Sequence, residues 1–318
     1  MIDLSIGADE PLKANQRQPE TMNVRRAVGS VLGGAGLVAA ANATISARLG
    51  PLDSPLERAP SSYRWRGLDV SYTTAGDPAN PDLIALHDMG LGASSREFVG
   101  MIDELTTDFH VIAPDYPGFG RSERAPLFYS GSLYEDFLAE FVSNVAEAPV
   151  CLAVGMSVGY AAVATPAANV RRIVGICPHT GPPSRPAAVR SLLRNRFIGQ
   201  PLLRALALRP GGLPSGMDRP YAKRCAMQPG ARFAQTAYLI GDLCPSNTFS
   251  GPLPVPQTPV SLLWGQFARN PSLATGQELA ERTDSKLTVI DRTGLRPHIE
   301  RPEAVTDFLL QELGRRRV

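Results

Sequence analysis

One serine lies in a glycine-flanked hexapeptide that could hold a nucleophile. The segment VGMSVG (residues 154–159) follows an apolar run, and its two glycines predict a tight turn between a strand and a helix. A serine hydroxyl is a weak nucleophile until a base takes its proton. The first N–H groups of the helix would favour negative charge on a bound oxygen. The segment predicts a nucleophilic centre at Ser157, at the apex of the turn, that needs a base and an acid from elsewhere in the chain.

The elements that must position this serine are alternating strands and helices. Six apolar runs read as buried strands, at residues 83–88, 110–115, 150–155, 171–178, 259–265 and 286–291. Helical patterns separate most of these runs. Continuous apolar strands alternating with helices predict an α/β fold, a mostly parallel sheet flanked by helices on both faces.

The alternation stops in the middle of the chain. Residues 182–257 contain helical pieces broken by proline and glycine, and we expect an inserted helical lid there. The core would comprise residues 60–181 and 258–318. Ligands of open α/β sheets bind at the carboxyl ends of the strands, where such a lid would sit. His179 follows the fourth of the runs, so we expect it at that edge as a catalytic or binding residue.

The N-terminal region allows more than one interpretation. Residues 1–21 are polar and predict a disordered tail, while residues 22–59 predict an Ala/Gly-rich helix and a linker. Basic residues followed by a weakly apolar run imitate a secretory signal. The other interpretation is a helix at residues 24–47 that packs on the domain or contacts a membrane surface. We expect a cytoplasmic protein, with export or membrane association as the alternative.

Composition restricts the partners. The 318 residues include 32 basic and 30 acidic side chains, which gives a net charge of +2 and does not indicate nucleic acid as a partner. No CxxC motif or cysteine–histidine cluster occurs, so we expect no metal. No phosphate loop or dinucleotide-type glycine motif occurs, so we expect no cofactor.

Four stretches in this order resemble the α/β-hydrolase superfamily over about residues 60–315. They are LIALHDMGLGASSREF (83–98), VIAPDYPGFGRSE (111–123), GMSVG (155–159), and PVSLLWG (259–265) with the later GLRPHIERPEAV (294–305). The resemblance implies that Ser157 is the nucleophile. It also implies that the N–H groups of Met89 and Val158 form the oxyanion hole.

Both proton-handling partners of the family are replaced here. Ala268 stands where the resemblance places the acid, and Leu295 stands where it places the histidine. Loss of the base from a serine triad lowers the rate on the order of 10⁴–10⁶-fold. The triad is therefore degenerate, and another histidine would have to act as the base. His298 lies three residues further along the same loop and is our candidate, with His179 as the second.

Asp88 departs from the family as well, because glycine is common at that position. A carboxylate beside the oxyanion loop would oppose an oxyanion. If it pointed inward, it could act as a base or bind a polar substrate group. If it pointed outward, it would only tolerate the loop geometry, and this is the interpretation that we favour. Asp88, His179 and Met156 are the further residues expected near the pocket.

The function follows from these residues and from an apolar lid. Leucines of the lid predict a pocket for a small apolar organic molecule. We expect an enzyme that cleaves an ester, lactone or thioester through Ser157 and His298. The alternatives are a non-hydrolytic lyase, isomerase or cyclase on the same scaffold, and a catalytically silent binding protein.

Overall fold

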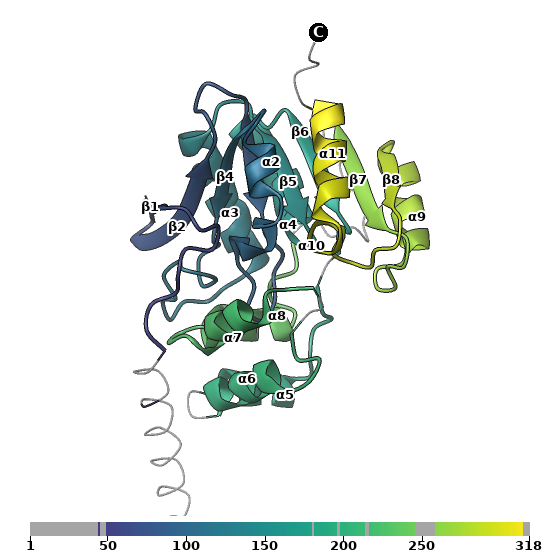
Figure 1. The fold of residues 1–318 in the computed structure, drawn as a ribbon. Coiled ribbons are helices and arrows are strands. Elements are labelled where there is room, and N and C mark those ends of the chain that lie inside the picture. The colour runs from purple at the N-terminus through teal and green to yellow at the C-terminus, as the bar shows by residue number, and fades with distance from the viewer. Residues whose placement is uncertain are drawn as a thin grey trace, which may run out of the picture.

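The computed structural model describes residues 44, 49–179, 181–195, 198–213, 216–245 and 258–313. The predicted tail at residues 1–21 and most of the predicted helix at 22–59 lie outside these residues, whereas 49–59 contain no helix. The chain from Pro60 onward forms one eight-stranded sheet in the order β1-β2-β4-β3-β5-β6-β7-β8 (Figure 1). The strands are β1 (Pro60–Trp65), β2 (Leu68–Ala75), β3 (Asp82–Leu86), β4 (His110–Pro114), β5 (Val150–Val154), β6 (Arg172–Ile176), β7 (Val260–Gly265) and β8 (Lys286–Ile290).

The prediction of a mostly parallel sheet is confirmed. Strands β4, β3, β5, β6, β7 and β8 pair in parallel, and only β1 and β2 pair antiparallel to their neighbours. The central strand β5 is buried at all five residues. A parallel sheet needs cover on both faces, which is why its strands read as unbroken apolar runs.

Helices cover both faces of the sheet. One apolar core packs α3 (Gly131–Val145) and α4 (Ser157–Ala168) against the sheet. A second core packs the 3₁₀ turn η1 (Ser95–Phe98), α2 (Ile102–Leu105) and α11 (Pro302–Leu313) against it. Near the other edge, α9 (Leu273–Thr283) contacts β7 and β8, and the short α10 (Pro297–Glu300) precedes α11.

The described residues between β6 and β7 form four helices. They are α5 (Ala187–Arg194), α6 (Gly199–Leu208), α7 (Arg219–Met227) and α8 (Arg232–Leu239), and we call residues 182–257 the helical insert. The insert lies beyond one end of the sheet, with α5 and α6 as its outer layer (Figure 1). These helices occupy the interval predicted for a lid, whose function as a lid stays a prediction. Within the described ranges, no helix is both long enough and apolar enough to cross a bilayer.

Candidate active site

The turn after β5 reverses the chain at a glycine. Gly155 follows the last residue of β5 directly and has φ +57°, a left-handed backbone that favours glycine. The helical backbone then begins with Met156 (φ −65°, ψ −28°), which is the N-cap of α4. The sequence motif placed the apex of the turn at Ser157. The structure places it at Gly155, because the positive φ is at Gly155 and the backbone is already helical at Met156.

Ser157 lies inside the first turn of α4 and lines neither of the two cavities described below. Its side chain is fully buried, and its hydroxyl donates to the carbonyl oxygen of His87 at 2.5 Å. The N–H of Val158 donates to the carbonyl oxygen of Gly155 within the helix turn. No histidine side chain contacts Ser157 through a hydrogen bond in the described part of the chain. The geometry thus does not bring together Ser157, His298 and the Val158 N–H.

The carboxylate of Asp88 lies beside the turn at Gly155. Its Oδ1 accepts from the N–H of Met89 at 2.8 Å and from the N–H of Met156 at 3.0 Å. A Cβ atom on Gly155 would lie 2.1 Å from the same Oδ1, so only glycine leaves room for the carboxylate. The outward orientation that we favoured for Asp88 is wrong, because two converging backbone donors hold the anion inside.

The second oxygen of Asp88 contacts two basic side chains. His179 Nε2 lies 3.2 Å from Oδ2, and an Arg296 guanidinium nitrogen lies 3.4 Å from it. Gly181 N–H donates to His179 Nδ1 at 3.0 Å, so Nε2 carries the proton that points to Asp88. Burial alone would raise the pKa of Asp88, but His179, Arg296 and the Met156 N–H outweigh it and lower that pKa well below its usual value. Asp88 is therefore an anion over the whole physiological range.

The loop that carries Asp88 is braced by His87. The ring nitrogen Nε2 accepts from the N–H of Tyr116 at 3.1 Å, which leaves the proton on Nδ1. Nδ1 then donates to the carbonyl oxygen of Asp88 at 2.7 Å. The ring also packs edge-on against Tyr116 and Phe119. These contacts fix the backbone from which the carboxylate projects.

The main cavity lies between the carboxyl ends of the strands and the helical insert. It has a volume of about 680 Å³ and is lined by Asp88, His179, Tyr238, Leu295 and Arg296, among others. Leu295 presents an apolar side chain here, where the resemblance would place an imidazole. Tyr238 comes from α8, and burial raises the pKa of its phenol to about 12, so that it remains a proton donor. Ser157 and Met156 do not line this cavity.

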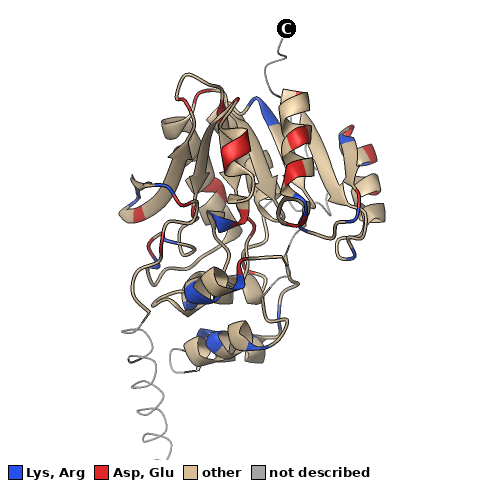
Figure 2. Cartoon of the chain, in the orientation of Figure 1, with Lys and Arg blue, Asp and Glu red and all other residues tan. Residues whose placement is uncertain are grey.

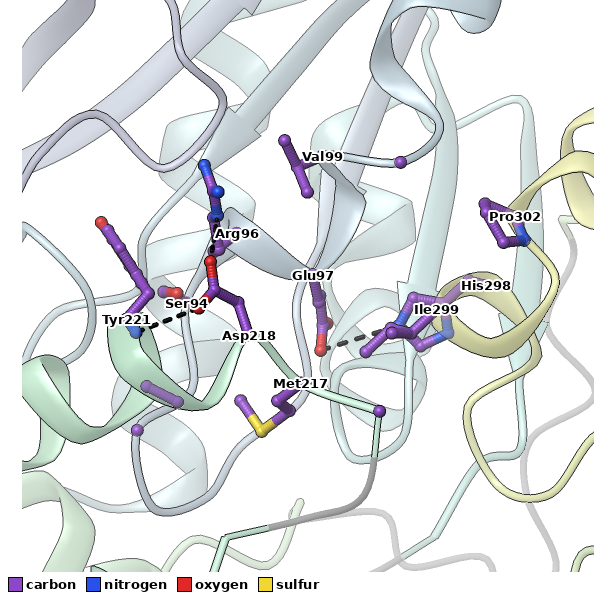
Figure 3. Close-up of a pocket in the computed structure, with 14 residues that line it drawn as sticks. Ser94, Arg96, Glu97, Val99, Met217, Asp218, Tyr221, His298, Ile299 and Pro302 are labelled. Atoms are coloured by element: carbon purple, nitrogen blue, oxygen red, sulfur yellow. Dashed lines mark hydrogen bonds and ion pairs between the residues drawn. The ribbon is translucent and has the colours of Figure 1, made fainter.

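His298 belongs to a second, smaller cavity. This side cavity, of about 260 Å³, lies between η1, the start of α7 and α10 (Figure 3). His298 is fully buried there, with Nε2 3.7 Å from Glu97 Oε2 and with its ring near Phe98. Arg296 joins the two cavities, because its guanidinium lies 3.1 Å from Glu97 and 3.4 Å from Asp88. His298 thus faces Glu97 and not Ser157.

Two members of this buried cluster escaped the sequence-based interpretation. Glu97 accepts from the Asp88 N–H at 2.8 Å through Oε1. Burial would raise the pKa of Glu97, but His298 and Arg296 outweigh it and lower that pKa. Glu97 and Arg296 lie in two of the stretches that carry the family resemblance, but no local sequence pattern indicated that these two residues form an ion pair. Among the described residues, no group of three His, Cys, Asp or Glu side chains could hold a metal ion.

Comparisons with known proteins agree with this architecture. The model of the alpha/beta hydrolase family matches residues 83–308. An uncharacterized hydrolase of Saccharomyces cerevisiae is 46% identical over 57 residues, which are 18% of this chain and 19% of that protein. A 3-hydroxybutyrate-oligomer hydrolase of Cupriavidus necator is 28% identical over 140 residues, 42% of this chain and 45% of that protein. The chain thus spans less than half the length of these two relatives.

A solved structure extends the likeness to most of the fold. The thioesterase domain from the curacin biosynthetic pathway is 14% identical, with a TM-score of 0.63, over 79% of this chain and 99% of that domain. At this identity the likeness concerns the fold alone. The family model, by contrast, matches more than half of the chain. The chain therefore belongs to the alpha/beta hydrolase family.

Proposed function

We propose that this protein is a hydrolase of small, mainly apolar epoxides that uses the Asp88 carboxylate as its nucleophile. The observation that supports the proposal is the orientation of this carboxylate. Oδ1 is held by the N–H groups of Met89 and Met156, while Oδ2 lies against His179 at the wall of the main cavity. A carboxylate that is always ionised can attack an electrophilic carbon without a base.

The two backbone N–H groups suit the second half of such a reaction. Asp88 Oδ2 attacks a ring carbon, the carbon–oxygen bond of the epoxide breaks, and the alkoxide takes the proton of Tyr238. Water then adds to Cγ of the resulting ester, and the charge that develops on Oδ1 is stabilised by the N–H groups of Met89 and Met156. As the intermediate collapses, the departing diol oxygen takes one proton of the water and the Tyr238 phenolate takes the other. The Asp88 carboxylate is thereby regenerated with one oxygen from water.

The substrate follows from the rest of the cavity wall. Pro182, Pro271 and Leu279 provide apolar surface beside the polar groups. A small apolar molecule with one polar, electrophilic group fits this combination. Cleavage of an ester, lactone or thioester through Ser157 is less well supported, because the Ser157 hydroxyl is buried against a backbone carbonyl.

Binding without turnover is the second candidate, and one observation favours it. Both oxygens of Asp88 are already hydrogen-bonded, and His179 and Arg296 both contact Oδ2. Hydrogen bonds to a carboxylate lower its nucleophilicity as well as its pKa. If these contacts persisted with a ligand present, the cavity would hold the ligand unchanged.

Isotope labelling separates these functions. We would incubate an excess of enzyme with styrene oxide in H₂¹⁸O for a single turnover, and then digest the protein and weigh the peptide that contains Asp88. The proposal expects ¹⁸O in this peptide and none in the first diol released. Label in the diol alone would show direct attack by water and overturn the nucleophilic role. Labelling of Ser157 by a fluorophosphonate, with turnover of p-nitrophenyl acetate, would restore the serine mechanism. Saturable binding of styrene oxide without diol formation would establish the second candidate.

A further inference from the structure

The helical insert is strongly basic, in contrast to the rest of the chain. Residues 182–257 contain ten basic side chains and two acidic ones. Because the whole chain has a net charge of only +2, the remaining residues together carry a net negative charge. The basic residues are Arg185, Arg190, Arg194, Arg196, Arg204, Arg209, Arg219, Lys223, Arg224 and Arg232. Such an asymmetry predicts an anionic partner at this end of the molecule.

The two acidic residues of the insert neutralise little of this charge. Asp242 forms ion pairs with both Arg190 and Arg194, and Asp218 pairs with Arg96 of the core. Arg209 and Arg219 are exposed and form no ion pair within the described part of the chain. Blue segments of the ribbon, which mark Lys and Arg, accordingly lie on the helices of the insert, with few red segments beside them (Figure 2).

Exposed apolar side chains gather at the same end. Nine large apolar residues are highly exposed in the described ranges, and four of them belong to α5, α6 or the turn between these helices. They are Val189, Leu192, Ile198 and Leu208, with exposed fractions from 40% to 52%. Two more, Leu127 and Phe128, lie on a core loop, where the Arg194 guanidinium lies 5.7 Å from the Phe128 ring. A concentration of exposed apolar residues marks an interaction surface.

We propose that α5 and α6 of the helical insert dock on an anionic phospholipid surface. Arg209, at the end of α6, would bind a phosphate headgroup, and Arg190 and Arg194 leave one positive charge beyond their shared Asp242. Leu192 and Leu208 would enter the acyl boundary, as in other interfacial helices. A lipid surface explains apolar exposure beside positive charge better than a nucleic acid does, because phosphate contacts alone need no exposed leucines. Among the described residues, α5 and α6 lie furthest from the sheet, at the end of the domain where a membrane plane could approach them (Figure 1). The proposal is independent of the epoxide chemistry.

Vesicle co-sedimentation of the full chain tests the proposal. The vesicles are phosphatidylcholine alone, or equal parts of phosphatidylcholine and phosphatidylglycerol. We expect binding only to the anionic vesicles, weakened by salt. Each basic residue near an anionic surface strengthens binding about fivefold, so Arg209→Gln should bind about fivefold more weakly. The pair Leu192→Gln/Leu208→Gln should lose about tenfold.

A matched change on the core provides the control. Arg171→Gln removes one exposed core arginine and should alter vesicle binding by less than about twofold. Equal binding to both kinds of vesicle, or insert variants that bind like this control, would overturn the proposal. So would a deletion of residues 1–43 that removes all binding while the insert variants retain it. Binding of transfer RNA that Arg209→Gln weakens, without vesicle binding, would replace the membrane with a nucleic acid.

Discussion

The turn at Ser157 and the loop at Asp88 contain the two residues that could act as a nucleophile, and their surroundings differ. The Ser157 hydroxyl is buried and donates to a backbone carbonyl. The Asp88 carboxylate accepts from two backbone N–H groups and lines a cavity of about 680 Å³. A hydroxyl must be activated by a base, whereas a carboxylate must only be held as an anion. The surroundings of Asp88 meet its requirement and those of Ser157 do not.

The largest expected effect is on turnover. Asp88→Asn removes the anion and should lower single-turnover diol formation from styrene oxide on the order of 10⁴-fold, as loss of a nucleophile does. Thermal unfolding of the variant would verify that it still folds. Unchanged turnover in a folded Asp88→Asn protein would remove Asp88 from the reaction.

The largest expected effect on stability is at Arg296, whose guanidinium contacts both Asp88 and Glu97. Arg296→Met leaves Asp88 and Glu97 buried without their shared guanidinium, and loss of one partner of a buried ion pair costs about 3–5 kcal/mol. Urea unfolding measures the change, with the exposed Arg171→Met as the control. A loss below about 1 kcal/mol would mean that water already screens these carboxylates.

A methyl group on the turn tests how closely the two regions fit. Gly155→Ala adds a Cβ atom 2.1 Å from Asp88 Oδ1 at a positive φ, which should destabilise the fold by about 3 kcal/mol. Gly67 has φ +89° but nothing within 4 Å of its added Cβ, so Gly67→Ala should cost only about 1–2 kcal/mol. In a protein that also carries Asp88→Gly, Gly155→Ala and Gly67→Ala should destabilise the fold by similar amounts. Equal costs at Gly155 and Gly67 would show that the carboxylate can move aside.

The pH dependence of stability should reveal the buried anions. The pKa values of Asp88 and Glu97 are lowered from 3.8 and 4.5, so their contribution is complete above those values and is lost as the pH falls through the lower folded-state values. In the unmodified protein, the unfolding free energy should therefore decrease between about pH 5 and pH 2. In Asp88→Asn this decrease should be smaller by about 2 kcal/mol. Urea unfolding across this range would measure it, and identical slopes would argue against a depressed pKa for Asp88.

The smallest effect is expected at the residue that the motif favours. Ser157→Ala removes one hydrogen bond to a carbonyl oxygen and should cost about 1 kcal/mol of stability. Diol formation should change by less than about threefold, because the hydroxyl does not reach the main cavity. A fall of 100-fold or more would return the catalytic role to Ser157.

The sheet could be predicted because burial acts on many residues at once. The run VCLAV (150–154) is buried throughout, and the other parallel strands follow the same apolar pattern, so their number and order with the helices could be inferred from sequence. The replaced positions Ala268 and Leu295 were also visible, since they stand at fixed offsets in recognisable motifs. No comparable pattern distinguishes a serine at the apex of a turn from one two residues beyond it.

By itself, the sequence determined the α/β architecture and the helical interval between two strands. It also showed Ala268 and Leu295 at the positions where the family resemblance expects an acid and a histidine. Only the tertiary structure decided that Gly155 forms the apex and that Asp88 turns inward. It also decided that Arg296 contacts both Asp88 and Glu97, which lie about 200 residues before it in the chain. The physical reason is that periodicity reports which face of an element is buried, whereas a hydrogen-bonded cluster depends on distances between loops that share no pattern.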